Sequence, residues 1–226
     1  MKLNPRDKRH SLGDMPLVTE TLGFAPVYSD YLRTWDLQKT YHEEVLAGDR
    51  ESTILLLEHP PVYTAGKRTE DHERPDDGTE VIDVDRGGKI TWHGPGQLVA
   101  YLVYKLNDTK EVRLFVSQLE DSMIELLAEY DIEATTIEGR AGVWILGDGT
   151  RRDRKIGAIG IRIHEGVTMH GLALNCSNDL GAYESIIACG IADADTTTMS
   201  AELGRNVTPK DVANRLDEIL HTHITA

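Results

Sequence analysis

Two neighbouring apolar runs, residues 155–163 and 167–176, constrain the fold more than any other feature of the chain. Both are rich in aliphatic residues and glycine, and only His164-Glu165-Gly166 separates them. A connection this short joins strands that run antiparallel. A third run, residues 97–105, is apolar on both faces, which is typical of a strand at the centre of a sheet. The three runs together predict a largely antiparallel sheet.

Shorter apolar runs at residues 53–57, 81–84, 90–92 and 141–146 predict further strands, and residues 30–46, 114–130 and 209–221 show helical spacing. Strands and helices do not alternate regularly, so we expect an α+β fold with a mixed, mainly antiparallel sheet flanked by helices. Residues 1–22 are polar and mixed in charge, and we interpret them as a flexible N-terminal tail. Residues 23–226 then form a single domain.

The charge balance narrows the choice of partners. The chain of 226 residues has a formal net charge of −14. Nucleic acids and anionic membranes are bound through basic surfaces, so we expect neither as a partner. No run of about 18 apolar residues is present, and the first twenty residues lack the apolar core of a secretory signal. We therefore expect a cytoplasmic protein, and, without an obvious dimer seam, a monomer.

Neither a metal nor another cofactor is indicated. The two cysteines form no CxxC pair, and the nine histidines do not show the spacing of zinc ligands. Gly66-Lys67 and Gly88-Lys89 are not followed by the serine or threonine of a phosphate-binding loop. We expect no cofactor and no metal site.

The two thiols differ in their surroundings. Cys176 shares one strand face with Leu172 and Leu174, which favours a core position. Cys189 lies in Ala188-Cys189-Gly190, where the glycine allows a substrate to approach closely. Cys189 therefore has two interpretations, a small buried hydrophobic residue or a nucleophile, and the residues alone do not decide between them.

Lys155 also has two interpretations, a solvated cation at the mouth of a strand or a partner for a thiol. An ordinary thiol has a pKa of about 8.5, so little thiolate forms at neutral pH. An ammonium group within about 4–6 Å favours the thiolate. A Cys–Lys dyad is therefore chemically sensible, provided that folding brings Cys189 and Lys155 together.

The glycine-rich stretch RGGKITWHG, residues 86–94, combines a turn, two cations, an aromatic ring and an imidazole. By its residues alone it is either a simple hairpin or a substrate-binding loop. Residues 157–160 and Gly171 could likewise present backbone N–H groups to an oxyanion.

Several motifs in the same order resemble those of the lipoyl(octanoyl) transferases. They are EHPPVYT at residues 58–64, RGGKITWHGPGQ at 86–97, KIGAIG at 155–160, HGLALN at 170–175 and ACGI at 188–191. The resemblance extends over about residues 24–205. One departure is Ala188, because family members usually have proline before the cysteine.

The resemblance implies roles for individual residues. Cys189 would be the nucleophile that accepts the acyl group, and Lys155 would lower the pKa of its thiol. Substrate contacts would come from three stretches: Arg86, Gly87, Gly88, Lys89, Ile90, Thr91, Trp92 and His93; Ala158, Ile159 and Gly160; and Gly171, Leu172 and Ala173.

The resemblance also implies a fold and partners. The fold would be the biotin/lipoate ligase-like catalytic domain with an acyl tunnel. The donor would be octanoyl-acyl carrier protein, and the acceptors would be lipoyl domains of 2-oxoacid dehydrogenase complexes and the glycine cleavage H protein. Passing from a thioester to an amide is downhill, so no ATP is needed.

Four finer expectations follow from that mechanism. Backbone amides near Gly160 and Leu172 would hold the oxyanion, and Lys155 in its neutral form would deprotonate the acceptor lysine. Val99 and Ile159 would line the tunnel. Because the partners are acidic as well, docking would need a local basic patch, for which the candidates are Arg151, Arg152, Arg154, Lys67 and Arg68.

Two rival functions remain open. An ATP-dependent lipoate or biotin ligase of the same fold would use the lysine and need no cysteine. A non-catalytic acyl-binding protein would use only the pocket. Both predict that Cys189→Ser is nearly harmless, whereas the transferase loses its activity.

Overall fold

The computed structural model describes residues 17–186 and 193–224. In chain order the strands are β1 (Val18–Gly23), β2 (Thr53–Leu57), β3 (Val62–Ala65), β4 (Val81–Asp83), β5 (Ile90–His93), β6 (Gln97–Val103), β7 (Thr135–Ile137), β8 (Arg140–Ile145), β9 (Arg154–His164), β10 (Val167–Asn175) and β11 (Asp195–Thr196). The α-helices are α1 (Tyr31–Ala47), α2 (Val112–Glu129), α3 (Met199–Leu203) and α4 (Pro209–Ile224). Three short 3-10 helices are η1 (Asp71–Glu73), η2 (Thr109–Glu111) and η3 (Gly181–Tyr183).

The strands of the described residues form two sheets. The larger has eight strands in the order β1-β2-β6-β10-β9-β8-β7, and β11 pairs with β9. All its neighbours along this path run antiparallel except β1 and β2. The smaller sheet has the order β4-β3-β5. The expectation of an α+β fold with a mixed, mainly antiparallel sheet is confirmed.

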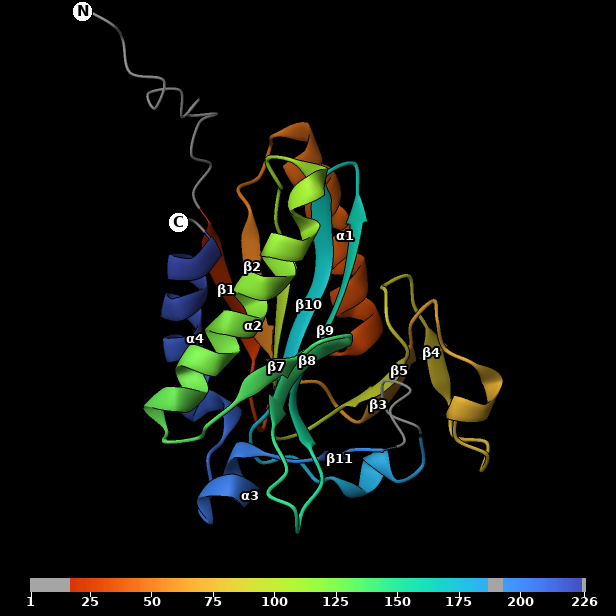
Figure 1. Ribbon diagram of the computed structural model, residues 1–226. Helices are drawn as coiled ribbons and strands as arrows, with labels where there is room; N and C mark the ends of the chain where they lie inside the picture. Colours follow the sequence, from red (N-terminus) through yellow and green to blue (C-terminus); the bar gives the residue numbers. More distant parts are fainter. Residues whose placement is uncertain (1–16, 187–192, 225–226) are drawn as a thin grey trace, which may run out of the picture.

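Helices cover both faces of the large sheet (Figure 1). On one face α2 and α4 pack together over β6, β9 and β10, and on the other α1 covers β6 and β10. This is why β6 is apolar on both faces: Leu98 and Leu102 join the core under α2 and α4, while Val99 and Tyr101 join the core under α1. The central position predicted for residues 97–105 is confirmed.

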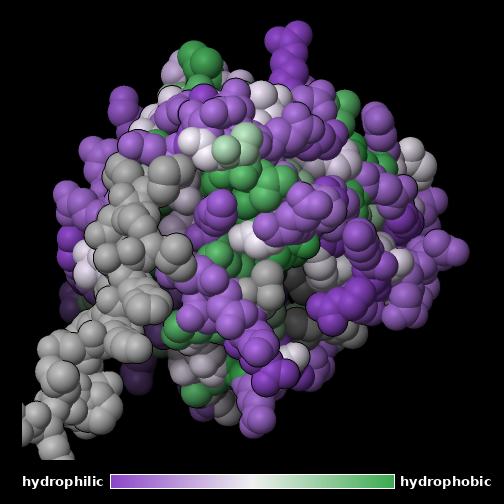
Figure 2. Space-filling model, turned by 90° about the horizontal axis from the view of Figure 1, so that it is seen from above, coloured by the Kyte–Doolittle hydropathy of each residue, from purple (hydrophilic) through white to green (hydrophobic). Residues whose placement is uncertain are grey.

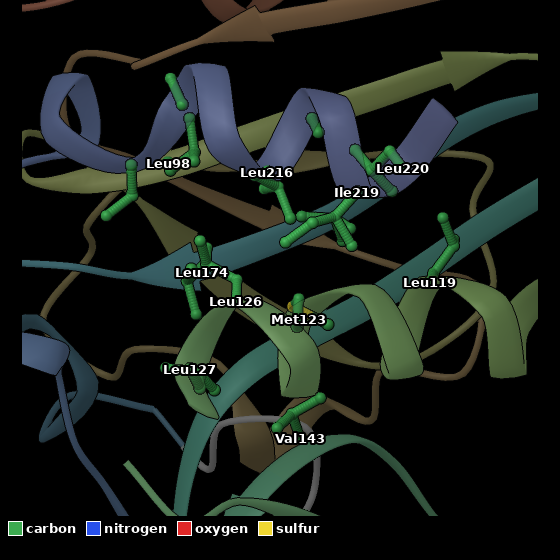
Figure 3. Packing of buried hydrophobic residues seen from close by; sticks show 14 of the residues in the cluster. Leu98, Leu119, Met123, Leu126, Leu127, Val143, Leu174, Leu216, Ile219 and Leu220 are labelled. Carbon is green, nitrogen blue, oxygen red and sulfur yellow. The ribbon is translucent and has the colours of Figure 1, made fainter. Parts of the chain in front are cut away.

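The larger core lies between α2, α4 and the sheet. Figure 3 shows Leu119 and Met123 of α2 and Leu216 and Ile219 of α4 projecting into this space, and all four side chains are essentially inaccessible. At about 25 cal/mol per Å² of apolar area removed from water, such burial is the main stabilising contribution. On the end of the molecule drawn in Figure 2, hydrophilic side chains predominate and apolar ones lie in small groups between them.

The N-terminal expectation needs correction. Residues 1–22 were predicted to be a flexible tail; residues 1–16 lie outside the described residues, but Val18–Gly23 is strand β1, paired parallel with β2. The prediction failed because an edge strand is held by its backbone, so its exposed side chains can be polar. Strands β3 and β7, with four and three residues, were also not predicted because such short runs give little periodic signal.

Candidate functional site

A cavity of about 440 Å³ lies between the large sheet, the small sheet and the hairpin of β7 and β8. Its wall is formed by residues from nearly every part of the fold: Tyr31, Arg68, residues 86–89, Thr91, His93, Tyr101, Val116, residues 139–141, Lys155, residues 158–161 and residues 170–173. The walls of the cavity combine apolar, aromatic and cationic groups. Such a lining is typical of a small-molecule site.

Small residues on β9 and β10 make room for this cavity. Ala158 pairs with Ala173, and Gly160 pairs with Gly171, so β9 and β10 carry no large side chain at these two pairs. A Cβ on Gly171 would lie 2.2 Å from the backbone oxygen of Ala100, which excludes any other residue without a backbone shift. Gly171 of the HGLA motif is therefore required by the close packing of the sheet itself.

Arg86 fixes the glycine-rich loop opposite that floor. Its buried guanidinium donates to the backbone oxygens of Gly87 (3.1 Å), Lys89 (2.9 Å) and Thr64 (2.8 Å). The amide of Gly87 donates to the carbonyl of Ile161 on β9, at 2.9 Å. These contacts hold residues 86–89 against both sheets, so Arg86 shapes the wall of the cavity.

We call the rings of Tyr31, His59, His93 and Tyr101 the deep wall: Tyr31, His93 and Tyr101 line the cavity, and His59 contacts all three. His59 donates from Nδ1 to the Ser29 carbonyl at 2.6 Å, and its Nε2 lies 2.8 Å from the Tyr101 hydroxyl. Burial lowers the pKa of His59 to about 4, so the imidazole is neutral and Nε2 accepts from Tyr101. Tyr31 stacks on His93 with ring centroids 6.1 Å apart and an interplanar angle of 13°.

The other side chains of this wall are also held in their neutral forms. Burial, helped by nearby His59, lowers the pKa of His93 to about 3, and its Nδ1 lies 2.7 Å from the Gln97 amide oxygen. Burial raises the pKa of Tyr31 to about 12. The four rings are therefore uncharged at neutral pH, which suits an apolar ligand.

His170 sits beside these rings in an unusual backbone conformation. Its φ is +60°, a region that residues other than glycine rarely adopt. Its Nε2 lies 2.9 Å from a carboxylate oxygen of Asp85, and its backbone amide donates to Gln38 at 2.7 Å. Burial of Asp85 opposes ionisation, but the hydrogen bond from His170 and the charge of Arg162 outweigh it and lower the Asp85 pKa to about 2.

Lys155 lies between this cavity and a second one of about 290 Å³. Its Nζ is 5.2 Å from the centroid of the Trp144 ring, and Trp144 also lines the second cavity. The rest of that wall comes from Leu180, Tyr183, Glu184, Ile186 and residues 194–196. Lys155 is thus the one charged side chain common to the described walls of the two cavities.

The two cysteines are separated by the structure. Cys176 is fully buried in the core under α4, and burial raises the pKa of its thiol to about 12. The prediction that Cys176 is a core residue is confirmed. Cys189 and the neighbouring Ala188 lie outside the described residues.

Most residues predicted to contact substrate do line the cavity: residues 86–89, Thr91, His93, residues 158–160 and residues 171–173. Ile90 and Trp92 are buried at the alternate positions of β5 and are not in its wall, because successive strand residues point to opposite faces. Of the two residues expected to line an acyl tunnel, Ile159 does, whereas Val99 is buried in the core under α1.

Two finer expectations are wrong. Strand β10 is paired with β6 and β9 on either side of Leu172, so the Leu172 amide belongs to the sheet and does not serve an oxyanion. Arg154 is 8% exposed and its guanidinium donates to Glu202 at 2.9 Å, which removes it from the expected basic patch. Arg151 is exposed but bonds to Asp148 in the same turn.

Sequence reasoning missed several wall residues, among them Tyr31, Tyr101, Arg140 and His170. The two tyrosines were counted only as apolar positions of a helix and a strand. His170 stood inside a quoted motif but was given no role. The signal that could have drawn attention to it is the imidazole inside an otherwise apolar run.

The residues that the structure describes contain no group of three or more His, Cys, Asp or Glu side chains arranged to hold a metal ion. Within residues 17–186 and 193–224, no helix has both the length and the apolar character needed to cross a bilayer.

Comparisons with known proteins agree with one another. Residues 30–221 match the family described as the lipoyl protein ligase A/B catalytic domain. The chain is 57% identical over 209 residues to an octanoyltransferase of Paenarthrobacter aurescens, covering 92% of this chain and 94% of the relative. It is 56% identical over 187 residues to an octanoyltransferase of Mycolicibacterium smegmatis, covering 83% and 82% of the two chains.

Solved structures share the fold at low sequence identity. A bipartite lipoate protein ligase from Thermoplasma acidophilum, described with its E2 lipoyl domain, aligns with a TM-score of 0.67 at 15% identity, covering 92% of this chain and 83% of the other. A lipoate-protein ligase A bound with ATP aligns with a TM-score of 0.56 at 13% identity, covering 92% and 83%. The expected ligase-like fold is therefore confirmed.

Proposed function

The chain belongs to the family of lipoyl protein ligase A/B catalytic domains, and on this premise we propose that it transfers an octanoyl group from octanoyl-acyl carrier protein to a lysine of a lipoyl domain. It is an acyltransferase, as its octanoyltransferase relatives are. The proposed acceptors are lipoyl domains of 2-oxoacid dehydrogenase complexes and the glycine cleavage H protein. The likeness to a ligase described with its E2 lipoyl domain supports an acceptor of this kind.

In this proposal Cys189 is the nucleophile and Lys155 its partner. The observation that carries it is that described residues before and after Cys189 in the chain, Ile186 and Thr196, both lie beside Lys155. Ile186, three residues earlier in the chain, lines the same cavity as Lys155. Three residues of chain reach at most about 11 Å, a distance that supports a pairing of the two side chains.

After Cys189 the chain is tied to the strand that carries Lys155. Thr196 pairs with Lys155 in the ladder of β11 and β9, and the Thr197 amide donates to the Lys155 carbonyl at 3.0 Å. The Asn175 side chain donates to the Thr197 carbonyl at 3.1 Å and accepts from Gln97 at 2.9 Å. These bonds connect the returning chain to the centre of the sheet.

The surroundings of Lys155 suit the stabilisation of a thiolate. Among the described residues no carboxylate lies within ion-pair distance of its ammonium, although Glu120 is close enough to be influenced by its charge. An ammonium that is not neutralised by a neighbouring carboxylate favours a nearby thiolate through its charge. Lys155 is therefore available to Cys189.

The proposed reaction has two balanced steps. The Cys189 thiolate attacks the thioester carbonyl, an oxyanion forms, and the carrier thiolate leaves, so one thioester replaces another. The neutral amine of the acceptor lysine then attacks the acyl-enzyme, the Cys189 thiolate leaves, and one proton passes from nitrogen to a base, for which Lys155 in its neutral form is the candidate. Gly160 also pairs with a residue of β10, Gly171, so its amide is excluded as an oxyanion donor for the same reason as the Leu172 amide.

Intact mass spectrometry tests the covalent step. The protein is mixed with octanoyl-acyl carrier protein in the absence of ATP, and one added octanoyl group is expected. The adduct should be absent from Cys189→Ser and present in Cys176→Ser, the matched control with a buried thiol. An unmodified wild-type protein would exclude the acyl-enzyme.

A second arm separates the transferase from an ATP-dependent ligase. Free octanoate with ATP should give no modified lipoyl domain, whereas octanoyl-acyl carrier protein should.

Lys155→Met should slow formation of the adduct strongly at neutral pH and recover part of the rate at high pH, where the thiol ionises without help. A pH profile identical to that of the wild type would show that Lys155 does not act on the thiol.

A further inference from the structure

The 440 Å³ cavity has an open and a closed end. Arg68, Gly139 and Ala141 line it and are exposed, whereas Tyr31 and Tyr101 also line it and are only 4% and 3% exposed. Lys155 is on strand β9 next to β8, the strand that carries Ala141, and so belongs to the open end. A linear substrate whose reacting group lies beside Lys155 therefore points its tail toward the two tyrosines.

The strand register shows how far the tyrosines lie from Lys155. Tyr101 on β6 pairs with Gly171 on β10, and Gly171 pairs with Gly160 on β9, so the three form one row across the sheet. Gly160 follows Lys155 by five residues, about 17 Å at ~3.3 Å per residue, and Tyr101 lies two strands, about 10 Å, further across the sheet. The phenol ring of Tyr101 stands at the end of a floor made of alanine and glycine.

That backbone separation, less the lengths of the Lys155 and Tyr101 side chains, leaves room for an acyl chain of medium length. With carbon–carbon bonds of ~1.5 Å, an extended eight-carbon chain spans roughly 9 Å. The remaining length accommodates the side chain of Lys155 at the open end and that of Tyr101 at the closed end. A chain several carbons longer meets the rings of the deep wall.

The deep wall is built to resist displacement. Tyr101 is held through His59 to the Ser29 carbonyl, with donor–acceptor distances of 2.8 and 2.6 Å. Tyr31 is fixed at the first turn of α1 and stacks on His93. Because these side chains are buried and paired, making room for extra methylenes would break hydrogen bonds in an apolar interior.

We propose that Tyr31 and Tyr101 form the end wall of the acyl site and set the longest acyl chain that the enzyme accepts. This inference rests on the proposed function for the acyl nature of the substrate and for the position of the reacting carbonyl beside Lys155. It assigns the limit of chain length to rings outside the glycine-rich loop.

Replacing Tyr31 by leucine tests the wall. The full-length variant is assayed with octanoyl-, decanoyl- and dodecanoyl-acyl carrier protein, and kcat/KM is measured for each. The ratio of dodecanoyl to octanoyl kcat/KM should rise about tenfold or more, since apolar pockets discriminate to this extent by size. Tyr101→Leu should change the ratio in the same direction.

Tyr41→Leu is the matched control, because Tyr41 lies on the same helix, is 8% exposed and is outside the cavity wall. It should leave the ratio unchanged. An unchanged ratio in both Tyr31→Leu and Tyr101→Leu, with circular dichroism showing folded proteins, would overturn the proposal. Failure of the Cys189–Lys155 mechanism would appear instead as loss of the octanoyl adduct with no change in chain-length preference.

Discussion

Acidification from pH 7 to pH 5 should destabilise this protein through two imidazoles of its deep wall. Burial lowers the pKa of His59 to about 4 and that of His93 to about 3, against about 6.5 in an unfolded chain. As the pH falls, the unfolded chain binds protons first. The contribution of the two neutral imidazoles to folding stability is therefore fully present above pH 6.5. It is lost as the pH falls from 6.5 to the pKa of each histidine in the folded protein.

Linkage gives the size of the effect. Between pH 7 and pH 5 each of these histidines should reduce the free energy of unfolding by about 2 kcal/mol, and the two together by about 4 kcal/mol. Asp85, with a pKa of about 2, contributes stability that is lost only below about pH 4, so it does not act in this window.

Urea unfolding followed by circular dichroism at pH 7, 6 and 5 measures the loss. His93→Gln should remove about half of the loss between pH 7 and pH 5, whereas His72→Gln, at a side chain that is 65% exposed, should not change it. Carbon-13 and proton NMR of the imidazoles gives an independent check. If His59 or His93 titrates near pH 6.5 in the folded protein, the reasoning is wrong.

Two further predictions concern stability. Gly171→Ala should lower the free energy of unfolding by about 2 kcal/mol or more, because the new methyl would lie 2.2 Å from the Ala100 oxygen. The control is Gly181→Ala, where the nearest atoms lie 3.5 Å or more from the new methyl. Equal denaturation midpoints of the two variants would contradict the predicted clash at Gly171. Leu216→Ala, at a fully buried position of α4, should lower the free energy of unfolding by about 2–5 kcal/mol. Leu114→Ala, at a side chain that is 56% exposed, should change thermal stability little. Similar losses of stability in the two variants would refute the assignment of the core.

The expectations that were right depended on long periodic runs. Residues 97–105 were apolar on both faces because helices cover both faces of the sheet there, and that pattern identified the central strand. The core position of Cys176 followed from its register with Leu172 and Leu174. Each of these inferences needs only local geometry, the period of a strand or a helix.

The expectations that failed needed knowledge of distant neighbours. Val18–Gly23 has the composition of a tail but finds a partner strand in β2. Arg154 looked like part of an exposed turn, yet Glu202, 48 positions later, buries it in an ion pair. Ile90 and Trp92 belong to the right motif, but the alternation of β5 directs them away from the cavity.

The sequence by itself determined the class of fold, the separation of a core thiol from a candidate nucleophile, and the motifs that identify the family. Only the tertiary structure decided what these residues surround. Tyr31 and Tyr101 are 70 positions apart in the numbering of the chain, and both rings contact His59 only because α1 packs across β6. The shape of a cavity depends on contacts between segments remote in sequence, and no local pattern in the chain records them.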